Sequence, residues 1–137
     1  MTPETKLEII EDFTNFCKIK FKIQELPSIT LIDDKSWVLK HHSFGQYSPQ
    51  SDSLLVYSKD RNLADVLRTL AHELFHHKQN ELNMLDSESG KTGSEIENQA
   101  NAAAGIALRE YGKKNKLIYE SIKSKIIKKL LLENGKK

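Results

Sequence analysis

Cysteine is almost absent from this sequence, since Cys17 is the single cysteine among 137 residues. One cysteine cannot form an internal disulfide, so nothing indicates an oxidising compartment. The N-terminus lacks the basic start and apolar run of a secretory signal. No apolar run approaches the roughly 18 residues that a membrane span needs. We therefore expect a cytoplasmic protein with no membrane span.

Internal repeats and low-complexity linkers are also lacking, which predicts a single domain over residues 1–137. Hydrophobic residues make up 38% of the chain and charged residues 29%. These values are ordinary for a globular protein, and the chain is long enough to bury one core. We expect a monomer.

Charge is unevenly distributed along the chain, although the net charge is only +2. Residues 1–108 hold 11 Lys and Arg against 16 Asp and Glu, a net of −5, whereas residues 109–137 hold 10 against 3, a net of +7. An apolar stripe in 113–137 predicts a basic amphipathic helix there. We favour a helix docked on the core with a solvated basic face. The alternative is a tether that binds nucleic acid, an anionic membrane surface or another acidic partner.

The periodicity of apolar residues predicts an α+β fold with a small, mostly antiparallel sheet. Helices are expected from Thr2 to near Phe21, from Asn62 to about Leu82, from Ser94 to a stop at Gly112, and from Lys114 to Glu133. Strands are expected at 28–32, 37–39, 44–47 and 54–57, and a loop at 83–93. The last two strands would pair antiparallel and form one wall of a cleft.

The helix expected from Asn62 contains the pattern HExxH. His72 and His76 are four residues apart, so their imidazoles project from one helix face and can share a metal ion. Glu73 lies about 100° further round the helix axis. It is therefore placed to take a proton from a metal-bound water rather than to bind the metal. This is the division of labour in a zinc hydrolase.

The competing interpretation is that these residues decorate an ordinary helix, because a chance HExxH occurs in roughly one chain of this length in a few hundred. An apolar stripe runs straight through the motif and would anchor the helix while the histidines face a groove. Its members are Leu63, Val66, Leu67, Leu70, Ala71, Leu74 and Phe75. This context favours the metal site.

A site with two histidines needs a third protein ligand. The next helix offers Glu95 and Glu97, which lie about 200° apart on a helix and cannot face the same point. Glu97 is favoured because Asn101, four residues later on the same face, can hydrogen-bond a ligating histidine. Glu95 remains the fallback ligand. The alanine-rich run at 100–107 would let this helix approach its neighbour closely.

The sequence HELFH at 72–76, followed by ENQAN at 97–101, resembles the zincin metallopeptidases. It is most similar to the glutamate-zincins such as the thermolysin-like enzymes, and to short HExxH peptidase domains of bacteria and phages. The resemblance covers residues of about 44 to 112. It implies a compact zincin-like domain that hydrolyses peptide or protein substrates. The alternative is a catalytically silent zincin-like fold used for binding or as a structural part, in which the metal only stabilises the fold.

The resemblance also implies the roles of the residues. Zn2+ would be bound by His72, His76 and Glu97, with Asn101 supporting a histidine. Glu73 would act as general base on the attacking water and pass the proton to the leaving amine.

Thermolysin-like enzymes add a histidine or tyrosine from a further segment to stabilise the oxyanion, and no motif identifies that residue here. The candidates for oxyanion or substrate contact are Tyr47 and Tyr111, followed by Tyr119, His41 and His42. His77 follows the second ligand on a different helix face, and we expect it at the surface or in indirect support of the site.

Overall fold

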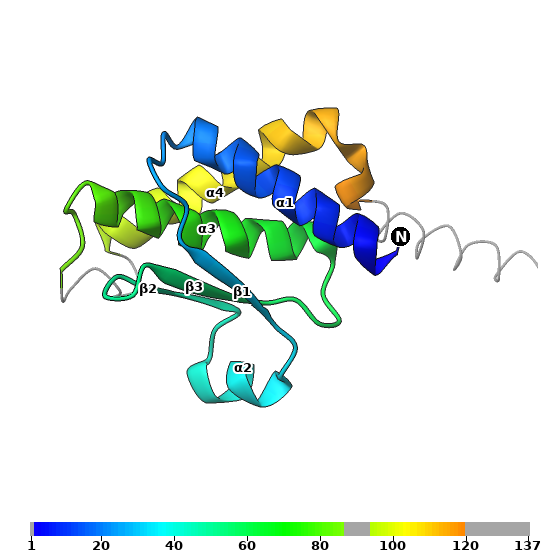
Figure 1. Cartoon of the computed structure of the whole chain (residues 1–137), viewed down its shortest axis with the longest axis horizontal. Coiled ribbons are helices and arrows are strands. Elements are labelled where there is room, and N and C mark those ends of the chain that lie inside the picture. Colours follow the sequence, from blue (N-terminus) through cyan, green and yellow to red (C-terminus); the bar gives the residue numbers. More distant parts are fainter. Residues whose placement is uncertain (1, 87–93, 120–137) are drawn as a thin grey trace, which may run out of the picture.

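The computed structural model describes residues 2–86 and 94–119 as an α+β domain (Figure 1). Its elements, in chain order, are α1 (Pro3–Lys20), β1 (Ser28–Ile32), α2 (Lys35–His41), β2 (Gly45–Ser48), β3 (Ser53–Tyr57), α3 (Leu63–Glu81), α4 (Glu95–Lys114) and the 3-10 turn η1 (Lys116–Tyr119). The predicted α+β class is confirmed. In the described ranges, no helix combines the length and apolar character that crossing a membrane requires.

The sheet has the strand order β1-β3-β2 and is mixed rather than mostly antiparallel. The predicted antiparallel pair is confirmed, with Tyr47 opposite Leu54. β1, however, pairs parallel to β3, with Ile29 opposite Leu54. Parallel neighbours need a long crossover, and α2 and β2 together fill the connection between these two strands. The order leaves β2 at an edge of the sheet.

The strand expected at 37–39 is wrong, because these residues lie in α2. The Asp34 carboxylate caps the start of this helix, with its Oδ1 accepting from the Ser36 N–H at 3.0 Å. No residue of α2 is buried. A cap and a short helical turn therefore outweigh the weak strand preference of Trp37 and Val38.

α3 is the central element of the fold. It lies between the sheet on one side and α1 and α4 on the other (Figure 1), and it contacts β2, β3, α1 and α4. Its stripe residues Leu67, Leu70 and Leu74 are fully buried, as the predicted periodicity requires. A helix packed on several sides is held rigidly, so side chains at its open edge have fixed positions.

The ends of the helices follow the predicted signals in part. α1 ends at Lys20, as expected, but α4 continues past Gly112 to Lys114. Gly112 marks a close approach instead of a stop, because a Cβ there would lie 2.7 Å from the Tyr119 hydroxyl.

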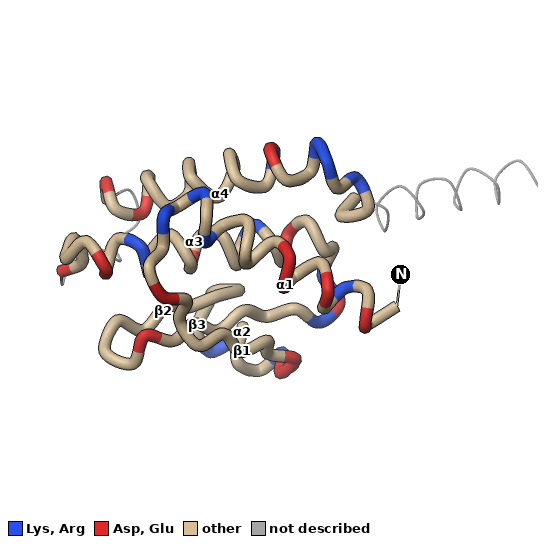
Figure 2. The backbone as a smooth tube through the Cα atoms, turned by 45° about the horizontal axis from the view of Figure 1, so that its top comes forward, with Lys and Arg blue, Asp and Glu red and all other residues tan. Residues whose placement is uncertain are grey.

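Lys113 and Lys114, in the last turn of α4, are the first residues of the segment 113–137 in which the sequence predicts a basic helix (Figure 2). Of the helix expected over 114–133, the residues up to 119 form the end of α4 and η1, and Ile118 is buried. The remainder of that prediction, and positions 87–93 of the expected loop, lie outside the described residues.

Candidate metal centre

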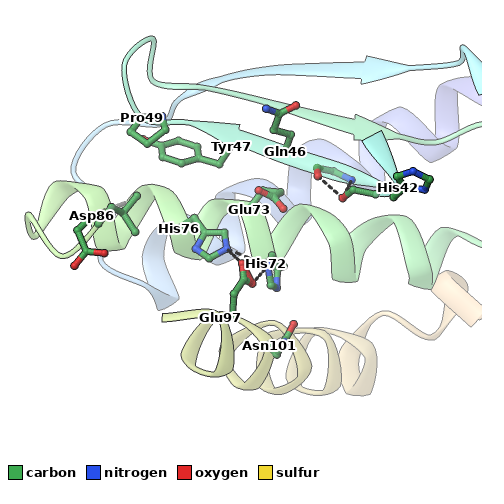
Figure 3. A pocket seen from close by; sticks show the side chains of 13 residues that line it. His42, Gln46, Tyr47, Pro49, His72, Glu73, His76, Asp86, Glu97 and Asn101 are labelled. Atoms are coloured by element: carbon green, nitrogen blue, oxygen red, sulfur yellow. Dashed lines mark hydrogen bonds and ion pairs between the residues drawn. The ribbon is translucent and has the colours of Figure 1, made fainter. Parts of the chain in front are cut away.

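His72 and His76 lie one turn apart on the edge of α3 that faces α4 (Figure 3). Their Nε2 atoms are 3.0 Å apart, and their side chains are 19% and 11% exposed. The buried leucines of α3 hold the opposite side of the helix in the core. The predicted pairing of the two imidazoles on one helix face is therefore present.

Glu97 reaches this pair from α4 (Figure 3). One carboxylate oxygen, Oε1, lies 2.9 Å from His76 Nε2, and the other, Oε2, lies 3.1 Å from His72 Nε2. Ala100 and Ala104 are buried, and their small side chains allow α4 to approach its neighbours closely. Ser94 caps the helix by accepting from the Glu97 N–H at 3.2 Å.

Glu95, the fallback ligand, does not join the cluster. Its side chain is exposed on α4 and accepts a hydrogen bond from the Gln99 amide at 3.5 Å. The helical phase difference of about 200° separates it from Glu97, as the sequence predicts. The structure therefore brings together His72, His76 and Glu97.

These three side chains fit a divalent metal ion. Their ligand atoms all lie within 4.8 Å of one another, and the closest distances between them are 2.9–3.1 Å. Tetrahedral zinc with bonds of ~2.0–2.1 Å separates its ligand atoms by ~3.3 Å, so a small expansion would admit the ion. Two imidazole nitrogens and one carboxylate also form a donor set of catalytic zinc sites.

Gln79 orients one of the two histidines, a role that the sequence did not reveal. Its Nε2 donates to the Ile96 carbonyl at 3.1 Å, which directs its Oε1 to His76 Nδ1 at 2.8 Å. His76 Nδ1 must then carry the proton, so Nε2 of the neutral imidazole has the lone pair that a metal would bind. Gln79 is only 1% exposed, and its amide links α3 to α4, the helix that carries Glu97.

We expect Gln79→Leu to weaken zinc binding by about 10- to 100-fold, the usual cost of losing an outer partner of a ligating histidine. Zinc affinity measured by chelator competition checks this. Gln99→Leu is the matched control, because it removes an amide from α4 while the bond from His76 to Gln79 persists. Equal zinc affinity in Gln79→Leu and wild type would contradict the role of Gln79.

Glu73 faces the β2 side of the same cleft (Figure 3) and is 7% exposed. Burial, and then the nearby Glu97 carboxylate, raise the pKa of Glu73 to about 8. A positive charge favours the ionised form of a neighbouring acid, so a bound cation would lower this pKa. Glu73 is therefore a carboxyl group beside the cluster that is mostly protonated at neutral pH, and a bound cation would favour its ionised form.

His72 has its pKa lowered by burial and then by repulsion from His76, while Glu97 and Asn101 oppose the shift. The lowered pKa favours the neutral imidazole, which is the form that binds metal. Asn101 contributes a side-chain hydrogen bond to His72 and lines the cavity beside it. The sequence predicts such a hydrogen bond from Asn101 to one of the two histidines.

Tyr47 and His42 line the cavity of about 590 Å³ that contains the cluster. The Tyr47 hydroxyl is engaged by His77 Nδ1 at 2.9 Å, by Asp52 Oδ1 at 3.0 Å and by the Asn80 amide at 3.0 Å. Burial is the main cause that raises the pKa of Tyr47 to about 12. The ring is thus a fixed wall of the cavity.

His77 is buried rather than at the surface, with 4% exposure. Its Nε2 contacts the Glu25 carbonyl at 2.6 Å, and its Nδ1 contacts Tyr47. It supports the cavity wall through that tyrosine.

The structure does not bring Tyr111 to the cleft. Its ring packs against Phe13 and Phe16, and its hydroxyl donates to Asp12 Oδ2 at 2.7 Å. Tyr111 lies 14 positions after Glu97 on α4 (111 − 97), which is ~21 Å further along the helix axis, at a point where the helix packs against α1. This distance places it away from the cluster and gives no support to the predicted substrate or oxyanion role. His41 stacks on Trp37, with ring centroids 4.4 Å apart, and is absent from the cavity lining.

Gly45 allows β2 to lie against α3 at the candidate base. A Cβ at this position would lie 2.6 Å from Thr69 Cγ2 and 3.2 Å from Glu73 Cγ. We expect Gly45→Ala to destabilise the fold by about 1–3 kcal/mol through overpacking.

The matched control is Gly105→Ala, because a Cβ at Gly105 on α4 meets nothing within 4 Å. It should instead stabilise the helix by about 0.5–1 kcal/mol. Urea unfolding compares the two variants, and a similar change in the free energy of unfolding for both would contradict the steric explanation.

No protein-family model, curated protein or solved structure matches this chain. The residues of the cleft and their geometry are therefore the basis for a functional assignment.

Proposed function

We propose that the protein is a zinc-dependent peptidase of the zincin type. The observation that carries this proposal is the convergence of His72, His76 and Glu97 within 4.8 Å, with Glu73 buried beside them in one cleft. Two helices and a strand supply these groups and the cavity wall. A solvated helix face has no need of such convergence, whereas a hydrolytic centre requires it.

His72, His76 and Glu97 would hold the metal, leaving room for a water molecule in a fourth position. Zinc, when bound, supplies Lewis-acid polarisation of the water and of the substrate carbonyl. Glu73 accepts the proton of the attacking water and delivers it to the leaving amine. Gln79 and Asn101 hydrogen-bond the two imidazoles and hold them in the orientation that binding requires.

The edge strand β2 supports a peptide as substrate. Gly45, Gln46 and Tyr47 of this strand line the cavity, and β2 pairs with a neighbour on one side only. The unpaired backbone of an edge strand offers N–H and C=O groups to an extended peptide. Such pairing would lay a peptide carbonyl along the cleft that contains Glu73.

The test measures zinc content and peptide hydrolysis on the full chain. We expect about one zinc per molecule, cleavage of a quenched fluorescent peptide library, loss of cleavage with a chelator and recovery with added zinc. Wild-type protein that binds zinc but cleaves no peptide, or cleavage that persists without metal, would overturn the proposal.

A further inference from the structure

A second cavity, of about 570 Å³, continues the cleft in the opposite direction along α3. Both cavities are lined by Ser43, Gly45, His72, Glu73 and Asn101. The first extends toward the C-terminal end of α3, where it reaches His76. The second extends toward the N-terminal half of α3, where it reaches Arg68 and Thr69. A substrate lying in the first cavity would therefore pass the candidate centre and enter the second.

Arg68 is the only Lys or Arg among the described residues that line the two cavities. It precedes His72 by four residues, so both lie on the same face of α3, one turn apart. In the described ranges, three acids line the two cavities, Glu73, Glu97 and Asp86, and the proposed reaction uses the first two. Arg68 is therefore a fixed positive charge in a part of the groove that the chemistry does not occupy.

The Arg68 guanidinium has no partner within the part of the chain that the structure describes, and the residue is exposed. Arg61, which precedes the first residue of α3, shows the contrast. Its guanidinium donates to the Tyr57 carbonyl at 2.9 Å and to Thr69 Oγ1 at 3.1 Å, and lies 4.1 Å from the centre of the Phe44 ring. Arg61 stabilises the fold, whereas no residue in 2–86 or 94–119 occupies the donors of Arg68.

We propose that Arg68 selects peptides carrying a carboxylate about two residues from the bond to be cleaved. One helical turn between Arg68 and His72 spans ~6 Å along the helix axis, and an extended peptide advances ~3.3 Å per residue. A guanidinium binds a carboxylate through two parallel hydrogen bonds, a geometry that favours it over neutral side chains. The carboxylate belongs either to an acidic side chain or to the free C-terminus of the peptide. This inference rests on the proposed peptidase function.

The experiment measures kcat/KM of the zinc-loaded full chain for peptides with Glu, Gln or Lys at each of three positions on either side of the cleaved bond. We expect about a tenfold preference for Glu at one position, which corresponds to one charged hydrogen-bonded pair. Arg68→Ala should lose this preference, and Arg68→Glu should prefer Lys there. A parallel series with free and amidated C-termini distinguishes the two sources of the carboxylate.

The matched control is Arg109→Ala, since Arg109 is exposed on α4 and lines neither cavity. It removes the same charge and should keep the wild-type preference. Active wild type without any preference for a carboxylate, or Arg68→Ala that retains it, would overturn the role of Arg68 and leave the peptidase proposal standing. Wild type that cleaves none of the peptides would overturn both.

Discussion

Glu73→Gln is expected to lower kcat for peptide hydrolysis by about 10²- to 10⁴-fold, the usual contribution of a general base, while zinc remains bound. Glutamine has nearly the same shape but cannot accept the proton of the attacking water. Glu73 is 7% exposed and packs beside Gly45, so an isosteric change preserves the wall of the cleft. The metal should stay, because the three donor atoms come from His72, His76 and Glu97.

The measurement pairs kcat with zinc content and thermal unfolding of the same preparation. Glu95→Gln is the matched control, because it neutralises an exposed acid on α4 that is outside the cluster. Undiminished cleavage by Glu73→Gln would contradict the base assignment. Loss of zinc in this variant would instead indicate that Glu73 is a metal ligand. If the metal only stabilises the fold, the wild type itself would show no peptide hydrolysis.

Helical phase is the part of the candidate centre that the sequence predicts best. The separation of four residues between His72 and His76 and the phase difference between Glu95 and Glu97 both follow from 3.6 residues per turn. The structure places these side chains as that geometry requires, with Glu97 at the cluster and Glu95 exposed. Such local geometry is fixed once the helix forms, whatever packs around it.

Packing between different helices and strands determines the features that the sequence did not reveal. Gln79 shares a helix face with both histidines, but its burial depends on the Ile96 carbonyl of α4, which no local pattern reports. The surroundings of Tyr111, a candidate for substrate contact, are likewise set by another element, because its ring packs against Phe13 and Phe16 of α1.

The parallel pairing of β1 is likewise a property of topology, since it requires that β2 and α2 occupy the crossover. The strand predicted at 37–39 from residue preferences is wrong, because the Asp34 cap is enough to start a helix there. The β-strand propensity of three residues contributes less than one helix cap whose hydrogen bond is formed.

Glu97→Ala is expected to weaken zinc binding by more than about 100-fold, beyond the loss typical of an outer partner. Its two oxygens approach both histidines, so one substitution removes the only carboxylate among the three donors and leaves two neutral imidazoles. Peptide hydrolysis should fall with zinc occupancy and recover in part at high zinc concentration. Competition with a chromogenic chelator measures the affinity.

Glu95→Ala separates the loss of a ligand from a general change in α4. Both residues lie in the first turn of that helix, where an acid interacts favourably with the helix dipole, so both variants lose a similar small contribution to stability. Only Glu97→Ala should lose zinc. If Glu95→Ala loses it instead, the fallback ligand is the true one. If neither does, the histidines bind zinc without α4, and the three-residue centre is wrong.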